Sequence, residues 1–266
     1  MRFPTSEAIA RLRPAGRTQK IAGLVLAVFS VVAGGAVLLA PPVLQDPRYH
    51  QFADQRTLLG VRNLLNVATN LPFAIIGTLG LWGLSGCGRK WRIGMQPASY
   101  LLFAAVFLVA FGSAFYHLEP SDATLFWDRL PMAVAFMSLL STLVADRMSP
   151  RAGAVLFLPL ACAGIASVVH WRLTDDLRFY LLVQFGSMLV ILSIALLFPS
   201  GWIRNRDLAA ILGWYLAAKV LELLDRWVYG LGGFVSGHSL KHLAAAMAAF
   251  WMLRTLTFWP PERRRT

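Results

Sequence analysis

The stretch GSAFYHLEPSDATLFWDRLPM, residues 112–132, joins two apolar runs and places a serine, a histidine and an aspartate among them. The apolar flanks have the composition of membrane-spanning segments. An ionisable group in or beside hydrocarbon costs several kcal/mol, so such groups are rare there and usually serve a function. Ser113, His117 and Asp128 are therefore the first candidates for a functional site.

The composition of the whole chain indicates an all-α integral membrane protein. Of its 266 residues, 57% are hydrophobic and 14% are charged, and apolar runs of about 20 residues, enough to cross ~30 Å of hydrocarbon, recur along the chain. The net charge of +12 comes from short basic clusters beside these runs, which argues against nucleic acid as a partner. Cys87 and Cys162 are the only cysteines, so no disulfide framework or Cys-based zinc motif is expected.

Eight apolar segments are long enough to span the bilayer. They cover Ile21–Val43, Val61–Leu84, Pro97–Leu118, Thr124–Ala145, Ala152–His170, Phe179–Phe198, Leu208–Tyr229 and Ser236–Phe258. The first has basic residues before it, as a signal peptide does, but it is longer than a usual signal core and no clean cleavage site follows, which favours a retained helix. Pro41 and Pro42 should end it, and Asp122 is the expected N-cap of the fourth span.

Basic residues give the orientation. In an eight-span arrangement, sixteen lysines and arginines fall on one side and five on the other, with four deeper in the spans. The five are Arg48, Arg56, Arg62, Arg172 and Arg178. Since positive charge accumulates on the cytoplasmic side, a multi-pass protein with both termini in the cytoplasm is expected.

This orientation brings polar residues from three spans to one depth near the non-cytoplasmic face. Ser113 and His117, four residues apart, share a helix face at the end of the third span, and Asp128 lies in the first turns of the fourth. In the eighth span, SGHSLKH places His238 and His242 four residues apart. The remaining histidines, His50 and His170, have no such pairing and are expected to be surface residues.

Three imidazoles, His117, His238 and His242, match a tetrahedral zinc site whose fourth position is open. Such a metal lowers the pKa of bound water toward ~7. Asp128 is then expected to orient or deprotonate the water, and Ser113 to donate a hydrogen bond to the oxyanion formed on an attacked carbonyl.

Charges in the seventh span complete the expected site. Glu222 is spaced to pair with Lys219 or Arg226, and mutual neutralisation is the simpler interpretation. Asp225 lies nearer the outer end, where it is a candidate acceptor for a hydrogen bond from a metal-ligating histidine.

The order of these motifs resembles the alkaline ceramidase family and its wider superfamily of seven-helix membrane hydrolases, which includes progestin and adipoQ receptor-like members. The resemblance lies in S-x-x-x-H, an aspartate eleven residues after that histidine followed by RLPM, and a late H-x-x-x-H; NVATN at residues 66–70 is similar to the W-N-x-x-S-N segment of the family. It covers about residues 51–256. It implies catalytic Ser113 and Asp128, and zinc on His117, His238 and His242.

The resemblance also implies a domain organisation. Residues 1–45 would form a cytoplasmic tail and an extra N-terminal transmembrane helix, residues 46–258 a seven-helix core, and residues 259–266 a basic cytoplasmic tail.

The calcium-binding segment of the eukaryotic enzymes is acidic and contains tryptophan, whereas YHQFADQRTLLGVRN at residues 49–63 ends in Asn63 where the family has glutamate. This departure argues against calcium.

The expected function is zinc-dependent hydrolysis of an amide, or less favourably an ester, in a ceramide-like membrane lipid, because the motif specifies hydrolytic machinery and leaves the lipid open. The main alternative is a receptor-like or sensor protein in which the zinc is structural. A histidine-ligated haem gives Ser113 and Asp128 no role. Ion conduction would need charges distributed across the bilayer rather than gathered near one face.

Overall fold

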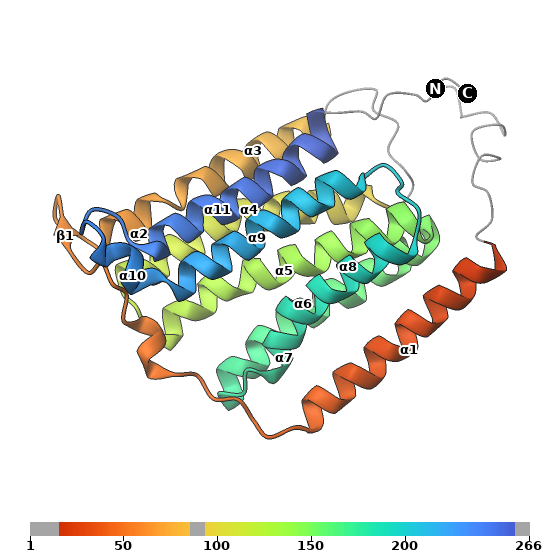
Figure 1. Ribbon diagram of the computed structural model, residues 1–266, viewed down its shortest axis with the longest axis horizontal. Helices are drawn as coiled ribbons and strands as arrows, with labels where there is room; N and C mark the ends of the chain where they lie inside the picture. Colours follow the sequence, from red (N-terminus) through yellow and green to blue (C-terminus); the bar gives the residue numbers. More distant parts are fainter. Residues whose placement is uncertain (1–15, 86–93, 259–266) are drawn as a thin grey trace.

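The computed structural model describes residues 16–85 and 94–258, and long helices make up most of this part of the chain (Figure 1). In chain order the elements are α1 (Arg17–Leu39), the 3₁₀ turn η2 (Pro47–His50), strands β1 (Thr57–Leu58) and β2 (Val61–Arg62), α2 (Leu64–Ala68), α3 (Leu71–Ser85), α4 (Gln96–Leu118), α5 (Asp122–Arg147), α6 (Pro150–Thr174), α7 (Arg178–Leu181), the π-turn η3 (Leu182–Gly186), α8 (Ser187–Leu197), α9 (Asn205–Leu223), α10 (Asp225–Gly230), α11 (Gly237–Leu253) and the π-turn η4 (Arg254–Phe258). The two expected tails fall largely or wholly in residues 1–15 and 259–266, outside the described residues, as does Cys87.

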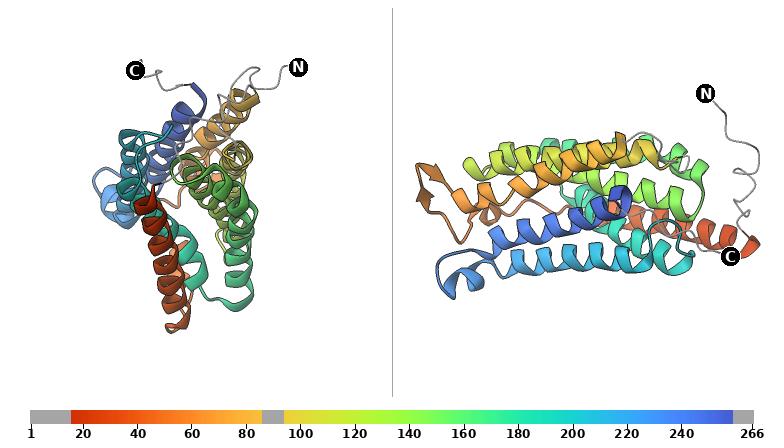
Figure 2. Two further views of the ribbon diagram at one scale, coloured as in Figure 1. Left: turned by 90° about the vertical axis from the view of Figure 1, so that its right-hand side faces the viewer. Right: turned by 90° about the horizontal axis from the view of Figure 1, so that it is seen from above.

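The long helices run side by side along one direction (Figures 1 and 2), and α5 occupies the centre of the bundle. It packs against α4 and α6, while α11 packs against α9 and α3. In the most apolar part of α5, 78% of the residues are buried, compared with 11% in α1. Helix α1 therefore lies at the periphery, where it contacts α7, η3 and α8.

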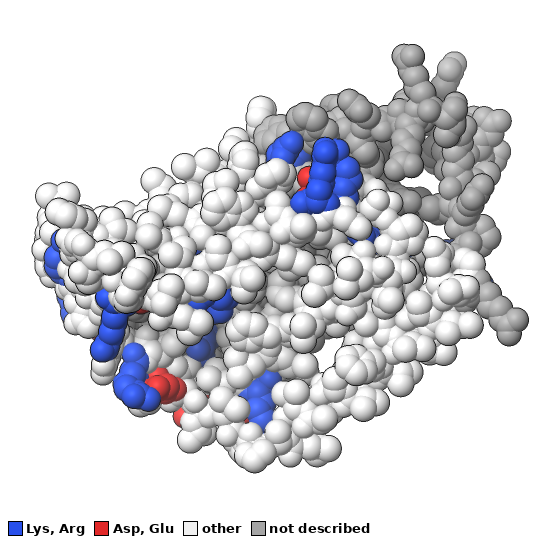
Figure 3. All heavy atoms as spheres, viewed as in Figure 1, with Lys and Arg blue, Asp and Glu red and all other residues white. Residues whose placement is uncertain are grey.

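Six helices of the described chain are long and apolar enough to cross a membrane, which identifies an all-α, multi-pass membrane protein. They begin with α1 and end with the continuous segment Arg178–Leu197. The last two expected spans correspond to α9 and α11, which pack in the same bundle. Helix α9 carries Lys219 and Glu222, which lower its hydropathy, and α11 has only 17 residues. Figure 3 shows that the visible lysines and arginines lie mostly toward the two ends of the molecule.

Two of the expected spans are interrupted, and one cap differs from expectation. The second span begins with a hairpin and the short α2 before α3, and the seventh is broken at Leu224 between α9 and α10. The N-cap of α5 is Ser121, whose hydroxyl accepts from the Thr124 N–H, so the assignment of this cap to Asp122 was wrong. Asp122 instead occupies the first helical turn, where its negative charge favours the helix dipole.

The peripheral helix α1 is anchored at one end by the turn between α6 and α7. Arg178 donates to the backbone carbonyls of Leu38 and Ala40 and, through the same guanidinium, to the Asp176 carboxylate. These Arg178 hydrogen bonds, with smaller contributions from backbone N–H groups, hold the pKa of Asp176 well below its ordinary value. Asp176 therefore stays ionised at neutral pH and keeps Arg178 in place.

A glycine allows α4 and α5 to touch at the level of the candidate site. A Cβ atom at Gly112 would lie 2.1 Å from the backbone oxygen of Trp127 and 3.3 Å from the backbone nitrogen of Asp128. Only a residue without a side chain permits this approach. Ser113, the next residue in α4, is thereby brought close to Asp128 in α5.

Candidate metal centre and adjoining cavity

His117, His238 and His242 converge from α4 and α11 into one buried cluster. The Nε2 atom of His117 lies 3.2 Å from Nε2 of His242 and 3.3 Å from Nε2 of His238. One nitrogen from each ring lies within 4.8 Å of the others, so the cluster can hold a metal ion. The expected convergence of these three histidines is confirmed.

The ring of His242 is held by a threonine that the sequence interpretation did not single out. The Thr69 hydroxyl donates to the backbone oxygen of Leu65 at 2.7 Å and lies 3.0 Å from Nδ1 of His242. Because its single proton is directed to Leu65, Thr69 accepts the N–H of Nδ1, which leaves a lone pair on Nε2. That lone pair faces Nε2 of His117. It is therefore available to a metal ion held by the cluster.

The cluster is covered by the loop that precedes the hairpin. The buried ring of Phe52 lies with its centroid 4.7 Å from that of His117 and 4.5 Å from that of His238. In the same loop, Arg56 donates to both carboxylate oxygens of Asp54 at 2.8 Å, which holds the pKa of Asp54 below its ordinary value. Asn63 donates its side-chain N–H to the His117 carbonyl at 2.8 Å.

Asp225 supports the site through the backbone. Its carboxylate accepts from the backbone N–H of His238 at 2.7 Å and from that of Ala53 at 2.8 Å. The first bond satisfies a free N–H in the opening turn of α11, and the second ties the Phe52 loop to it. Asp225 thus contacts His238 through its main chain, where an interaction with a histidine ring was expected.

Ser113 and Asp128 lie beside the cluster. Both are buried, and the Ser113 hydroxyl is within hydrogen-bonding reach of the Asp128 carboxylate. When this carboxylate is ionised it can only accept, and the Ser113 hydroxyl is then the donor of the hydrogen bond. Both residues line the same cavity as His242.

Glu222 pairs with two lysines. Lys219 or Arg226 was expected to pair with Glu222, and it is Lys219 that donates to one oxygen of the Glu222 carboxylate. Lys241 donates to the other oxygen at 2.5 Å. Lys241 immediately precedes His242 in α11, so this ion pair joins α9 to the helix carrying two of the histidines. The Tyr49 hydroxyl is also close, at 3.4 Å.

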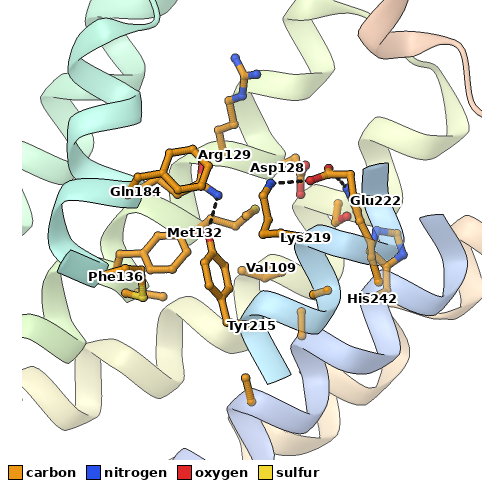
Figure 4. A pocket seen from close by; sticks show the side chains of 18 of the residues that line it. Val109, Asp128, Arg129, Met132, Phe136, Gln184, Tyr215, Lys219, Glu222 and His242 are labelled. Atoms are coloured by element: carbon orange, nitrogen blue, oxygen red, sulfur yellow. Dashed lines mark hydrogen bonds and ion pairs between the residues drawn. The ribbon is translucent and has the colours of Figure 1, made fainter. Parts of the chain in front are cut away.

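A cavity of about 390 Å³ opens from this group into the bundle. Its volume falls within the ~300–1,000 Å³ typical of small-molecule sites. Figure 4 shows Asp128, Lys219 and Glu222 near one another, with His242 beside Glu222. Apolar side chains such as Val106, Leu139 and Met252 line much of the remaining wall. The polar side chains beside the histidines form one end of the cavity. Gln184 and Tyr215, hydrogen-bonded to each other at 2.9 Å, are further polar groups in a wall that is otherwise largely apolar.

His50 is not the free surface residue that was expected. Its Nδ1 atom lies 3.0 Å from the Tyr116 hydroxyl and its Nε2 atom 3.1 Å from the Asp122 carboxylate. It thereby joins η2 to α4 and α5 directly beside His117. His170 is more exposed and lies 3.8 Å from the Asp176 carboxylate.

Comparison of this chain with protein-family models, with curated proteins and with solved structures gave no match. The function therefore has to be inferred from the geometry of the site.

Proposed function

We propose that this chain is a membrane-embedded, zinc-dependent hydrolase that cleaves the amide of a ceramide-like lipid. The observation that carries the proposal is the placement of a buried Ser113–Asp128 pair beside three converging histidines, at the polar end of a cavity with apolar walls. The order of the motifs supports membership of the alkaline ceramidase superfamily. In this proposal the segments from α3 to α11 form the seven-helix core of that superfamily, with α7 and α8 counted as one helix and α9 and α10 as another. Helix α1 is then the additional helix.

The spacing of the histidines fits zinc. Zn–N bonds of about 2.0–2.1 Å in a tetrahedron place neighbouring nitrogens about 3.3–3.4 Å apart. The observed Nε2–Nε2 distances of 3.2 and 3.3 Å agree with this value. Three histidine ligands leave the fourth position open, as in catalytic zinc sites. Zinc held there would supply Lewis-acid chemistry, lowering the pKa of water and polarising a carbonyl.

Asp128 and Ser113 then have complementary roles. Asp128 takes a proton from the water that attacks the amide carbon, and it returns this proton to the nitrogen as the C–N bond breaks. Once protonated, Asp128 no longer needs the Ser113 hydroxyl as a donor. Ser113 is then free to donate to the negatively charged oxygen that forms on the carbonyl carbon. The products are a fatty acid and an amine.

A purely structural zinc site, as in a receptor-like or sensor protein, leaves these features without a purpose. A buried carboxylate is costly, and stability alone does not require one beside the metal ligands at a cavity wall. The enzyme proposal accounts for Asp128, Ser113 and the cavity together.

The proposal is tested by incubating purified protein in non-ionic detergent with a total lipid extract and with defined N-acyl lipids. We expect release of fatty acid from an amide-linked lipid, loss of release after metal chelation, and recovery on addition of zinc. Zinc-loaded protein that releases no fatty acid from any of these lipids would instead support the structural role. Full activity in metal-free protein would contradict the zinc assignment.

We also propose that both termini are cytoplasmic and that the metal site lies toward the non-cytoplasmic face. The sixteen-to-five distribution of basic residues supports this orientation. The hairpin, the α4–α5 turn and α10 lie at one end of the bundle (Figure 1). The histidines are at the same end, because His117 is in the last turn of α4 and His238 is in the first turn of α11.

Single cysteines test this orientation in a background with Cys87 and Cys162 replaced by serine. Leu59 at the hairpin tip is 95% exposed, and Ser200 lies exposed at the opposite end of the bundle. We expect a membrane-impermeant maleimide to label Leu59→Cys in intact cells and Ser200→Cys only after permeabilisation. The reverse pattern would move the site to the cytoplasmic leaflet.

A further inference from the structure

Arg129 follows Asp128 in α5 and is only 5% exposed. Its guanidinium carbon lies 4.2 Å from the ring centroid of Trp171, 4.9 Å from that of Tyr180 and 5.4 Å from that of Tyr49. Nη2 donates to the side-chain oxygen of Gln45 at 2.7 Å. The aromatic rings hold the guanidinium in position and shield it from water.

This buried cation has no acidic partner among residues 16–85 and 94–258: no described carboxylate lies within ion-pair distance of it, and its Nη1 atom has no hydrogen-bond partner. Burying a charged group without a counter-charge is strongly disfavoured. Arg129 lines the cavity that contains Ser113 and Asp128. An anion bound in the cavity would supply the missing partner.

The other charges of the cavity do not supply that partner. Glu222 is already paired with both Lys219 and Lys241, so its negative charge is not available to Arg129. Asp128 accepts from Ser113. Asp46 also lines the cavity but is paired with Arg48 at 3.0 Å. With that ion pair set aside, Arg129, Lys219 and Lys241 exceed Asp128 and Glu222 by one positive charge. In Figure 4 the guanidinium of Arg129 extends away from Glu222 and His242, so the unmatched charge lies apart from the metal ligands.

We propose that the lipid bound in this cavity carries an anionic group, a carboxylate or a phosphate, on the amine side of its amide, and that Arg129 binds this group. The substrate class is then an anionic N-acyl lipid, such as an N-acyl amino acid, in place of neutral ceramide. That the bound lipid is a substrate rests on the proposed hydrolase function. The binding preference itself does not depend on turnover.

Binding of inert analogues tests the proposal. N-(hexadecylsulfonyl)glycine and N-(hexadecylsulfonyl)ethanolamine share the same alkyl chain and a non-hydrolysable sulfonamide. The glycine compound carries a carboxylate where the ethanolamine compound carries a hydroxyl. We expect the wild-type protein in non-ionic detergent to bind the glycine compound about 10- to 100-fold more tightly, as charge-assisted hydrogen bonds to a buried arginine allow. The phosphoethanolamine analogue tests the phosphate form, and preference for either anion supports the proposal.

Variants assign the preference to Arg129. Arg129→Gln should reduce it to about two-fold or less, and Arg129→Lys should retain part of it because the charge remains while the planar fork is lost. Arg147→Gln is the matched control: Arg147 is a buried arginine of the same helix that donates to Ile203, Asn205 and the end of α8. Its replacement should lower the melting temperature and leave the preference intact.

Equal affinity of the wild-type protein for all three analogues would overturn the proposal, whether or not any variant folds. A preference that persists in folded Arg129→Gln would show that another group binds the anion. If the analogues behave as expected while no lipid is hydrolysed, the anion site stands and the hydrolase function fails. Hydrolysis of neutral and anionic lipids at equal rates, with equal analogue affinities, would refute only the anion site.

Discussion

Replacing both His238 and His242 by alanine should leave the purified protein without zinc and without hydrolytic activity. The wild-type protein should carry about one zinc per chain, because three converging imidazoles are sufficient for tight binding. Loss of both α11 ligands leaves His117 alone, and one imidazole cannot retain the ion. Zinc content is measured by elemental analysis on the samples used for the lipid assay, with circular dichroism to verify the fold.

Two further variants sharpen this result. Thr69→Val removes the acceptor of the His242 Nδ1 proton and should weaken zinc binding about 10- to 100-fold without abolishing it. His170→Ala removes a histidine outside the cluster and should change neither zinc content nor rate. Protein with all three cluster histidines intact that is fully active without metal would contradict the assignment.

Asp128→Asn and Ser113→Ala should each retain zinc but lose activity. Without a carboxylate to accept the water proton, Asp128→Asn should be slower by about 10²–10⁴. Without the hydroxyl to stabilise the oxyanion, Ser113→Ala should lose about 10²–10³, mainly in kcat. Steady-state rates and zinc content measured on the same preparations separate loss of chemistry from loss of metal.

The contact between these two side chains adds a further expectation. Because the Ser113 hydroxyl and the Asp128 carboxylate interact, the double variant should lose less than the product of the two single losses. Ser99→Ala removes another buried hydroxyl from α4, away from the cavity, and should not change the rate. Wild-type rates at full zinc occupancy in both single variants would refute the catalytic roles.

The course of the helices was predictable from hydropathy, since apolar runs of bilayer length leave few alternatives. Their interruptions were not. Leu224 is an ordinary apolar residue, and no proline or glycine marks the break between α9 and α10. The break coincides with tertiary contacts: a Cβ at Gly237 would lie 2.3 Å from the Leu221 carbonyl, and Asp225 bonds the Ala53 and His238 N–H groups.

Helical spacing and depth predicted which histidines meet, because residues four apart share a face and connected helix ends lie at one level. Contacts from non-helical segments gave no such signal. Gln45 reaches Arg129 from 84 residues away, and His50 reaches Tyr116 from 66 residues away. The pairing of Lys241 with Glu222 depends on the packing of α9 against α11, which sequence spacing does not specify.

The backbone contact at Gly112 determines how the site can respond to a substrate. Side chains between two helices can change rotamer and let the helices shift, but at Gly112 main chain meets main chain. The separation of Ser113 and Asp128 is therefore set when the bundle folds, before any lipid enters. Little reorganisation remains for the reaction itself, which is the condition under which fixed hydrogen-bond donors lower a barrier most. Even a single added methyl group, as in Gly112→Ala, would move the two helices apart and loosen this preorganisation.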